Sequence, residues 1–234
     1  MNLPIIFDFG NSFAKVLDSK SKEVFRFTQK EFRSYLESCS DRPLFGCVSG
    51  DASVFDGLSN SIHVVSTSDK APLVSQYGSM DSLGTDRWAL CNAYFLSGQK
   101  SFLLVTMGTC ITYNVVKEGI FLGGAISPGW DLRYWAMHQK TSSLPLAEYS
   151  ENTPLLGSST IGSLKAGVDV ALQKELDAMI KDYSESFQLN NVLICGGASE
   201  RLSKPLKNYI FAPVNYELQA LWRLYEYYAD HGTF

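Results

Sequence analysis

Short apolar runs separated by glycine and polar turns dominate the first hundred residues. The apolar tetrad 4–7 enters an Asp-Phe-Gly-Asn-Ser turn, and an alternating stretch follows it. This pattern predicts a strand, a tight glycine turn and further strands in an antiparallel meander. The predicted strands lie at 4–7, 13–19, 23–28, 44–49 and 61–66. A helix is expected at 29–38, and strands interleaved with helices indicate an α/β domain.

The second half of the chain opens with the same arrangement. Residues 5–18 and 103–116 both read as an apolar strand, a turn that contains glycine followed by Asn or Thr, and a second strand. We interpret this as a duplicated unit. A third strand is expected at 120–127 and a strand that ends at a glycine pair at 189–199. Helical periodicity covers 159–187, and an apolar-rich helix is expected at 215–229.

Composition limits the size and class of the protein. Its 234 residues lie between one domain and two, so with the repeat we expect two lean domains at 1–100 and 101–234. The net charge of −4, from 20 basic and 24 acidic residues, argues against nucleic-acid or anionic-membrane partners. No apolar run approaches the roughly 20 residues of a membrane span, which favours a cytoplasmic protein. Five widely spaced cysteines argue against a disulfide framework or a zinc site.

The first glycine turn carries the groups that a phosphate site needs. Asp8 ends a buried strand, and Gly10, Asn11, Ser12 and Lys15 follow it. Glycine lets backbone approach an anion, an aspartate can hold hydrated Mg²⁺, and a lysine neutralises phosphate charge. The alternative is a plain hairpin turn, which the same residue types favour for backbone reasons.

The second glycine turn offers donors but no carboxylate. Gly108, Thr109 and Thr112 supply backbone and hydroxyl groups. Two such turns in matching places on duplicated domains would face each other across a cleft and hold a nucleoside triphosphate from both sides. Gly124 and Gly197 belong to strand ends with paired glycines, which suit either a nearby nucleotide or close packing of strand and helix.

A third stretch, Gly84-Thr85-Asp86-Arg87, begins a predicted helix. Thr85 is a candidate N-cap, and Asp86 in the first turn would be favoured by the helix dipole alone. The functional alternative is that Asp86 accepts a proton from a substrate hydroxyl while Arg87 grips a substrate carboxylate.

Taken in order, these motifs resemble type III pantothenate kinase over residues 5 to 221, most specifically through Tyr77 with Gly84-Thr85-Asp86-Arg87. The resemblance implies duplicated ribonuclease-H-like domains of the actin-like ATPase kind, with mixed five-stranded sheets flanked by helices. It also implies a homodimer and phosphorylation of pantothenate by ATP with Mg²⁺, the first step of coenzyme A synthesis. Alternatives are a kinase of the same superfamily for another small hydroxylated substrate, and a non-catalytic nucleotide-binding regulator or transcription accessory factor.

The resemblance also implies roles for single residues. Asp86 would be the general base, and Asp8 would help to organise Mg²⁺. The positions expected to face the ATP phosphates or the nucleotide are Asp8, Gly10, Asn11, Ser12, Lys15, Gly108, Thr109, Gly124 and Gly197. Those expected to bind pantothenate are Tyr77, Gly84, Thr85, Arg87 and, from the partner subunit of the dimer, Thr160.

The chain departs from the family pattern at the second turn. Thr106 and Asn114 stand where the family has acidic residues, and the first of these is associated with a monovalent cation, K⁺ or NH₄⁺. Because a threonine keeps the oxygen but not the charge, we expect weakened or absent potassium dependence. Met80 replaces a proline common after Tyr77, which makes that loop less rigid.

Overall fold

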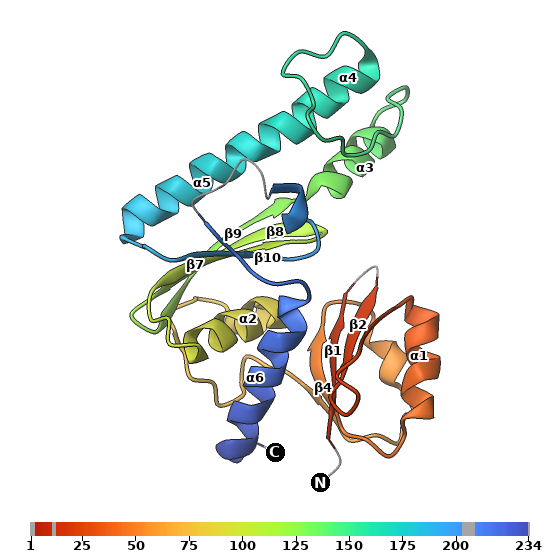
Figure 1. Cartoon of the computed structure of the whole chain (residues 1–234), viewed down its shortest axis with the longest axis vertical. Coiled ribbons are helices and arrows are strands. Elements are labelled where there is room, and N and C mark those ends of the chain that lie inside the picture. Colours follow the sequence, from red (N-terminus) through yellow and green to blue (C-terminus); the bar gives the residue numbers. More distant parts are fainter. Residues whose placement is uncertain (1–2, 11–12, 203–208, 234) are drawn as a thin grey trace. The chain divides into compact units, whose positions relative to one another are not determined.

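The chain divides into two units, and its last segment belongs to the first of them. The structure, a computed structural model, describes residues 3–10, 13–202 and 209–233 (Figure 1). Unit 1 comprises Met1–Gln99 and Asn215–Phe234, and unit 2 comprises Lys100–Val214. The predicted division placed all of 101–234 in the second domain, so the two differ at the C-terminal helix. That helix lies with unit 1 because its apolar side chains are buried there.

Unit 1 is built on a mixed five-stranded sheet in the order β3-β2-β1-β4-β5. Its strands are β1 (Ile5–Phe9), β2 (Ala14–Asp18), β3 (Val24–Phe27), β4 (Leu44–Val48) and β5 (Ile62–Val64). β1, β2 and β3 are antiparallel neighbours, whereas β4 runs parallel to β1 and β5 parallel to β4. The five strands predicted in this part of the chain are confirmed. A further short strand, β6, is Val74–Ser75.

The alternation of side chains along β1 gives this sheet two buried faces. Ile5, Phe7 and Phe9 pack with Phe32 and Leu36 of α1 (Gln29–Ser38). The opposite face is covered by α2 (Thr85–Leu96) and α6 (Tyr216–Asp230), as Figure 1 shows. α1 begins at a capping box, in which Thr28 and Glu31 bind each other's backbone N–H groups.

Residues of α6 account for its place in unit 1. Leu218, Leu221 and Leu224 are spaced three residues apart along the helix, and they pack with Ile6 of β1 and Phe45 of β4. Burial of each leucine contributes on the order of 2 kcal/mol to the hydrophobic stabilisation. The helix therefore closes unit 1 although about a hundred residues of unit 2 separate it from the rest of that unit.

Unit 2 repeats the strand order of unit 1. β7 (Phe102–Met107), β8 (Cys110–Lys117) and β9 (Ile120–Pro128) form an antiparallel meander. β10 (Val192–Cys195) lies parallel to β7, and β11 (Ile210–Phe211) lies parallel to β10. Five of the six strands of this sheet, in the order β9-β8-β7-β10-β11, thus match β3-β2-β1-β4-β5, whereas five strands were predicted for each sheet. This match confirms the predicted duplication and the α/β fold with mixed sheets.

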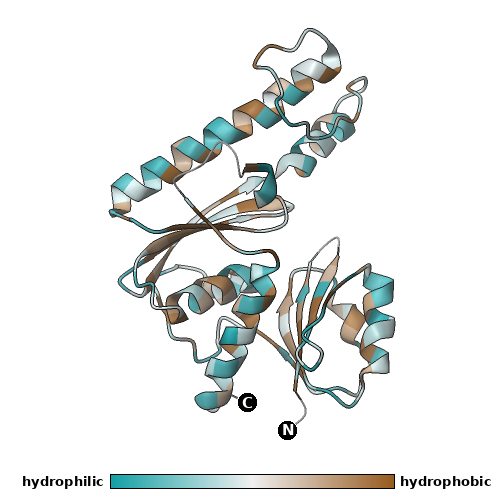
Figure 2. Cartoon of the chain, viewed as in Figure 1, coloured by the Kyte–Doolittle hydropathy of each residue, from teal (hydrophilic) through white to brown (hydrophobic). Residues whose placement is uncertain are grey.

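Helical elements of unit 2 contribute buried side chains to its core. They are α3 (Trp130–Lys140), α4 (Thr160–Lys165), a π-helical turn (Ala166–Val170) and α5 (Ala171–Phe187). Leu172, Leu176 and Ile180 recur every four residues and face the core formed with Val105 and Tyr113. Figure 2 shows hydrophilic and hydrophobic residues alternating along α5, as the predicted helical periodicity requires. Single-turn 3₁₀ helices occupy Ala52–Phe55, Met80–Ser82 and Ser199–Leu202.

A buried carboxylate ties the long connection after α3 to the π-helical turn. Asp169 is 1% exposed and accepts hydrogen bonds from Tyr134 Oη (2.7 Å), Thr153 Oγ1 (2.9 Å) and the Ser150 backbone N–H (3.2 Å). Three donors from two segments satisfy the carboxylate, which explains how a charged residue is accommodated in this core.

Candidate active site

The sheet of unit 1 brings the predicted phosphate residues into one row. Asp8 of β1 is paired in register with Lys15 of β2 and, on its other side, with Cys47 of β4. Paired residues of neighbouring strands project from the same face, so these three side chains share the face that α2 and α6 cover. The Gly10 N–H donates to the Phe13 carbonyl (3.1 Å) and closes the turn between β1 and β2. The predictions for Asn11 and Ser12 lie outside the described residues.

An acidic residue that the sequence analysis missed lies against Lys15. The Lys15 Nζ is 3.4 Å from Oε2 of Glu217, in the first turn of α6. Both side chains are half-buried, with exposed fractions of 26% and 13%. No local pattern could reveal this pair, because 202 residues separate its members.

Asp8 lies in a strongly acidic environment. Removal from solvent is the main cause that raises its pKa from 3.8 to about 7, and repulsion by Glu217 and Asp86 adds to it. Lys15 acts in the opposite direction and lowers this pKa. The region therefore holds three carboxylates and one ammonium group, a charge distribution that favours a bound cation.

The Gly84-Thr85-Asp86-Arg87 stretch begins α2 over this face. The Cys47 Sγ donates to the Thr85 carbonyl oxygen (3.6 Å), which anchors the start of the helix beside Asp8. Gly84, not Thr85 as predicted, is the N-cap residue, and Thr85 is the first residue inside the helix. A Cβ atom on Gly84 would lie 2.6 Å from Oδ1 of Asp86. Only glycine therefore leaves room for the Asp86 carboxylate in this orientation.

The side chains predicted to bind substrate form a second part of the site. Arg87 is 5% exposed, and its guanidinium lies 6.0 Å from the centre of the Tyr77 ring. Tyr77 itself is half-buried. The Thr85 Oγ1 is buried and has no hydrogen-bond partner among the described residues. A cation, an aromatic ring and an unpartnered hydroxyl near the start of one helix are groups that suit a small polar molecule with a carboxylate.

In unit 2 the equivalent turn carries a neutral network. The Thr106 Oγ1 lies 2.7 Å from the Thr112 Oγ1. The Asn114 side-chain amide donates to the same Thr112 Oγ1 (2.9 Å) and to the Leu104 carbonyl (3.2 Å). Asn114 is fully buried. These hydrogen bonds link the two positions, 106 and 114, at which the family pattern has acidic residues.

The glycines of unit 2 are of two kinds: some are required by backbone packing, and others are exposed. Gly108 and Gly197 are exposed, and a Cβ on either would have ordinary contacts or none, so backbone packing does not require glycine there. Gly124 packs directly against the Tyr113 carbonyl. Gly196 has φ +102° and packs against the Met107 backbone. Packing thus explains Gly124 and Gly196, whereas Gly108, Gly197 and the exposed Thr109 are open to a ligand.

Thr160 occupies the N-terminal end of α4. It is exposed, and the preceding Ser159 caps the helix by accepting a hydrogen bond from the Gly162 N–H (3.1 Å). A pocket between α3 and α4 is lined by Met137, Leu144, Thr160, Ser163, Leu164 and Gly167.

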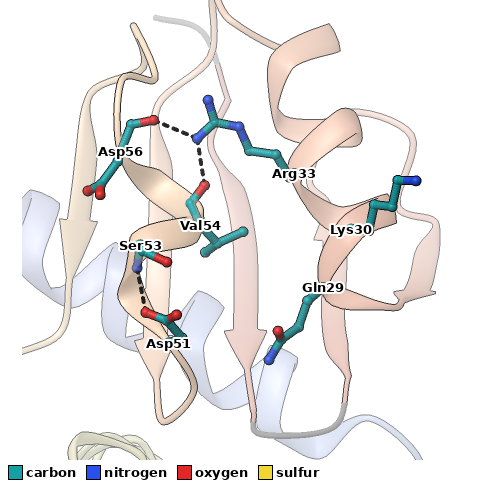
Figure 3. Close-up of a pocket in the computed structure, with 7 residues that line it drawn as sticks. All are labelled: Gln29, Lys30, Arg33, Asp51, Ser53, Val54 and Asp56. Carbon is teal, nitrogen blue, oxygen red and sulfur yellow. Dashed lines mark hydrogen bonds between the residues drawn. The ribbon is translucent and has the colours of Figure 1, made fainter.

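A polar pocket in unit 1 contains none of the predicted site residues (Figure 3). Arg33 of α1 donates there to the Val54 carbonyl (2.8 Å) and the Asp56 carbonyl (2.6 Å), and Asp51 accepts from the Ser53 N–H (3.0 Å). Its charged groups thus hold the segment after β4 against α1. We regard this pocket as structural.

The donor set around Asp8 suits Mg²⁺ bound together with a nucleotide. The described residues contain no group of three His, Cys, Asp or Glu side chains arranged to hold a metal ion by themselves. Mg²⁺ commonly binds through one or two carboxylates, with water and substrate phosphates completing its shell. Asp8, with further negative charge nearby, fits that arrangement.

Comparison with known proteins identifies the family. The sequence profile described as Type III pantothenate kinase matches residues 52–182. The chain is 33% identical over 235 residues to the type III pantothenate kinase of Christiangramia forsetii, a match that covers 94% of this chain and 96% of that protein. The chain belongs to the type III pantothenate kinase family.

Solved structures agree on the fold of this pantothenate kinase family member. A protein from Campylobacter jejuni described as a Baf family transcriptional activator has a TM-score of 0.67 at 19% identity, over 98% of this chain and 100% of that one. A 2-dehydro-3-deoxygalactonokinase from Sinorhizobium meliloti has a TM-score of 0.55 at 11% identity, over 97% and 99%. At these identities the likeness concerns the fold alone. No helix among the described residues is long and apolar enough to cross a membrane.

The raised pKa of Asp8 predicts how stability depends on pH in the absence of divalent cations. A carboxyl group with a pKa of about 7 in the folded protein and 3.8 when unfolded retains its proton on folding between these values. The free energy of unfolding should therefore fall as pH rises from about 4 to 7. Asp8→Asn, which mimics the neutral form, should be about 4 kcal/mol more stable than the wild type at pH 8 and equally stable near pH 4.

Urea unfolding of both proteins at pH 4 to 8 in the presence of a chelator measures this difference. Asp182→Asn, an exposed position on α5, is the control and should parallel the wild type throughout. Parallel curves for Asp8→Asn and the wild type would contradict the raised pKa.

Proposed function

We propose that the chain transfers the γ-phosphoryl group of ATP to the primary hydroxyl of pantothenate. The product is 4′-phosphopantothenate, and the reaction is the first step of coenzyme A synthesis. Membership of the type III pantothenate kinase family carries this proposal. Its chemical support is the gathering of Asp8, Lys15, Asp86 and Arg87 at one face of the unit 1 sheet.

ATP would be held by the glycine turns. On unit 1, the turn with Gly10 and Lys15 would receive the phosphates, and Asn11 and Ser12 remain predicted members of it. On unit 2, the open positions Gly108, Thr109 and Gly197 would offer backbone and hydroxyl donors. Gly124 is a weaker candidate, because packing against Tyr113 already accounts for it.

Asp8 would hold the Mg²⁺ that accompanies ATP. When bound, this ion neutralises charge on the transferring phosphoryl group. Lys15 adds a fixed positive charge on the neighbouring strand. Catalysis then depends mostly on positioning and charge neutralisation, as in other phosphoryl transfers.

Asp86 would act as the general base. Its carboxylate accepts the proton of the pantothenate hydroxyl while the hydroxyl oxygen forms its bond to the γ-phosphorus and the bond to ADP breaks. Arg87 is buried, with its guanidinium 6.0 Å from the centre of the Tyr77 ring, and it would bind the pantothenate carboxylate. The Thr85 hydroxyl, which has no hydrogen-bond partner among the described residues, would bind a polar group of the same substrate. Gly84 has no Cβ atom, and this leaves space for the carboxylate of Asp86, the proposed base.

Asp86→Asn should nearly abolish turnover and leave folding and ATP binding intact. The amide keeps the size of the carboxylate but cannot accept the proton, and loss of a general base costs about 10²- to 10⁴-fold in rate. A coupled ADP-release assay and thermal unfolding measure the two effects. An unchanged rate would remove Asp86 from this role.

The same assay tests the substrate. We expect ADP release that depends on pantothenate and not on a panel of sugars and small hydroxy acids. Release with another panel member alone would favour a different kinase of the superfamily. Absence of release with every substrate and cation, together with retained ATP binding, would favour a nucleotide-binding regulator.

We also propose that turnover depends little on potassium. The support is the neutral network in unit 2, in which the Thr106, Thr112 and Asn114 side chains bind one another and none carries a charge. Replacing NaCl by KCl or NH₄Cl at constant ionic strength should change the rate less than about 2-fold, the size expected when no charged ligand is present. Thr106→Asp should introduce a potassium-specific rise. A large potassium-specific rise in the wild type would contradict the proposal.

We further propose a homodimer formed through the region of α3 and α4. The support is the exposure of large apolar side chains there: Trp135 is 51% exposed, Leu155 74% and Leu156 84%. Large apolar side chains left exposed to solvent are typical of an association surface when they form a patch. Thr160, which the family resemblance places in the pantothenate site of the partner subunit, follows Leu155 and Leu156 closely in the sequence.

Sedimentation velocity should find a dimer for the wild type and a monomer for Leu155→Asp/Leu156→Asp, because two buried charges oppose association. Val214→Asp, at another exposed apolar position of unit 2, is the control and should remain dimeric. A monomeric wild type at micromolar concentration would contradict the proposal.

A further inference from the structure

The last helix places an acidic residue, Glu217, beside Lys15; it lies outside residues 52–182, which the family profile matches. We propose that Glu217 is a positioning residue: it holds the Lys15 ammonium group off Asp8 and so keeps the Asp8 carboxylate open to the divalent cation that arrives with ATP. This inference rests on the proposed function and adds a residue to its nucleotide site.

The pairing of β1 with β2 sets up a competition for Lys15. Asp8 and Lys15 are directly opposite each other, a position in which side chains of opposite charge attract. Among the described residues, however, the ion pair of Lys15 is with Glu217, at 3.4 Å. The ammonium group is thus drawn away from its cross-strand neighbour and toward α6.

The position of Glu217 is fixed by the packing of α6. Tyr216 and Leu218, on either side of it, are buried, and Leu221 one turn later is buried against the same sheet. Glu217 also lies in the first turn of its helix, where the helix dipole stabilises a negative charge. The carboxylate is therefore held at one place beside the sheet.

The charges around the Lys15–Glu217 ion pair explain how Glu217 would affect cation binding at Asp8. Asp86 and Glu217 are the acidic groups around Asp8, and Lys15 is the basic group on the neighbouring strand. If Glu217 were neutral, Lys15 would have Asp8 as its nearest opposite charge, and an ion pair there would compete with Mg²⁺ for the same oxygen atoms. Glu217 prevents that competition without touching the substrate.

The test is the binding of nucleotide, measured by titration calorimetry with ATP in the presence of Mg²⁺ and again with a chelator. Glu217→Gln keeps the size of the side chain and removes its charge. We expect it to weaken binding of the Mg²⁺ complex about 10-fold, which is typical of a residue that orients a metal ligand, and to change binding of metal-free ATP much less. Glu217→Asp, which keeps the charge, should retain most of the affinity for the Mg²⁺ complex.

A double variant shows whether Glu217 acts through Lys15. In a Lys15→Met background no ammonium group can reach Asp8, so Glu217→Gln should cause no further loss of Mg²⁺-dependent affinity. Glu226→Gln, at an exposed position of α6, is the matched control and should bind like the wild type.

Two results would overturn the proposal. One is wild-type affinity for the Mg²⁺ complex in Glu217→Gln, with or without a lower melting temperature. The other is an equal loss on Glu217→Gln in the Lys15→Met and wild-type backgrounds. None of these measurements uses pantothenate, so a wild type that binds ATP but does not phosphorylate pantothenate would contradict the proposed function and still decide the role of Glu217.

Discussion

The candidate site of unit 1 depends on the position of one ammonium group, that of Lys15, among three carboxyl groups. Lys15 lies on the same face as Asp8, close to Asp86 and Glu217, and each of the four comes from a different element: β2, β1, α2 and α6. The hairpin, the start of α2 and the return of the chain at α6 must all form before these charges are together. Burial, with repulsion by Glu217 and Asp86 in addition, raises the pKa of Asp8. A bound cation would offset the negative charge of these carboxylates, as expected of a site that binds Mg²⁺ together with ATP.

Duplication of the fold has not preserved the chemistry of the two turns. Both units have the same strand order, yet the turn of unit 1 is charged and that of unit 2 is neutral. In unit 2, Thr106, Thr112 and Asn114 satisfy one another by hydrogen bonds. Under the proposed function, cation binding would belong to unit 1, and unit 2 would offer the exposed backbone at Gly108 and Gly197. The repeated strand-turn-strand element would then make two kinds of contact with a ligand.

Local sequence patterns predicted most of this structure because most of it is locally determined. The alternation along β1, the repeated turns and the four-residue spacing on α5 are each visible within a short stretch of sequence, although the contacts that they make are with other elements. The placement of α6 could not be predicted in this way, since its leucines fit a helix in either unit and only packing against β1 and β4 decides between them. Glu217 was missed for the same reason. In the sequence it is an acidic residue in a first helical turn, and its partner is 202 residues away. Gly124 shows the opposite case, where a glycine that suits a ligand is explained by its contact with Tyr113.

The central claim is that these charges serve phosphoryl transfer to the primary hydroxyl of pantothenate. The most direct measurement is identification of the product by ³¹P NMR and mass spectrometry after incubation of the protein with Mg²⁺, ATP and pantothenate. The account predicts ADP and one new phosphomonoester, located on the primary hydroxyl, in equal amounts. Conversion of ATP to ADP and inorganic phosphate alone, or no conversion at all by a folded protein that binds ATP, would contradict it.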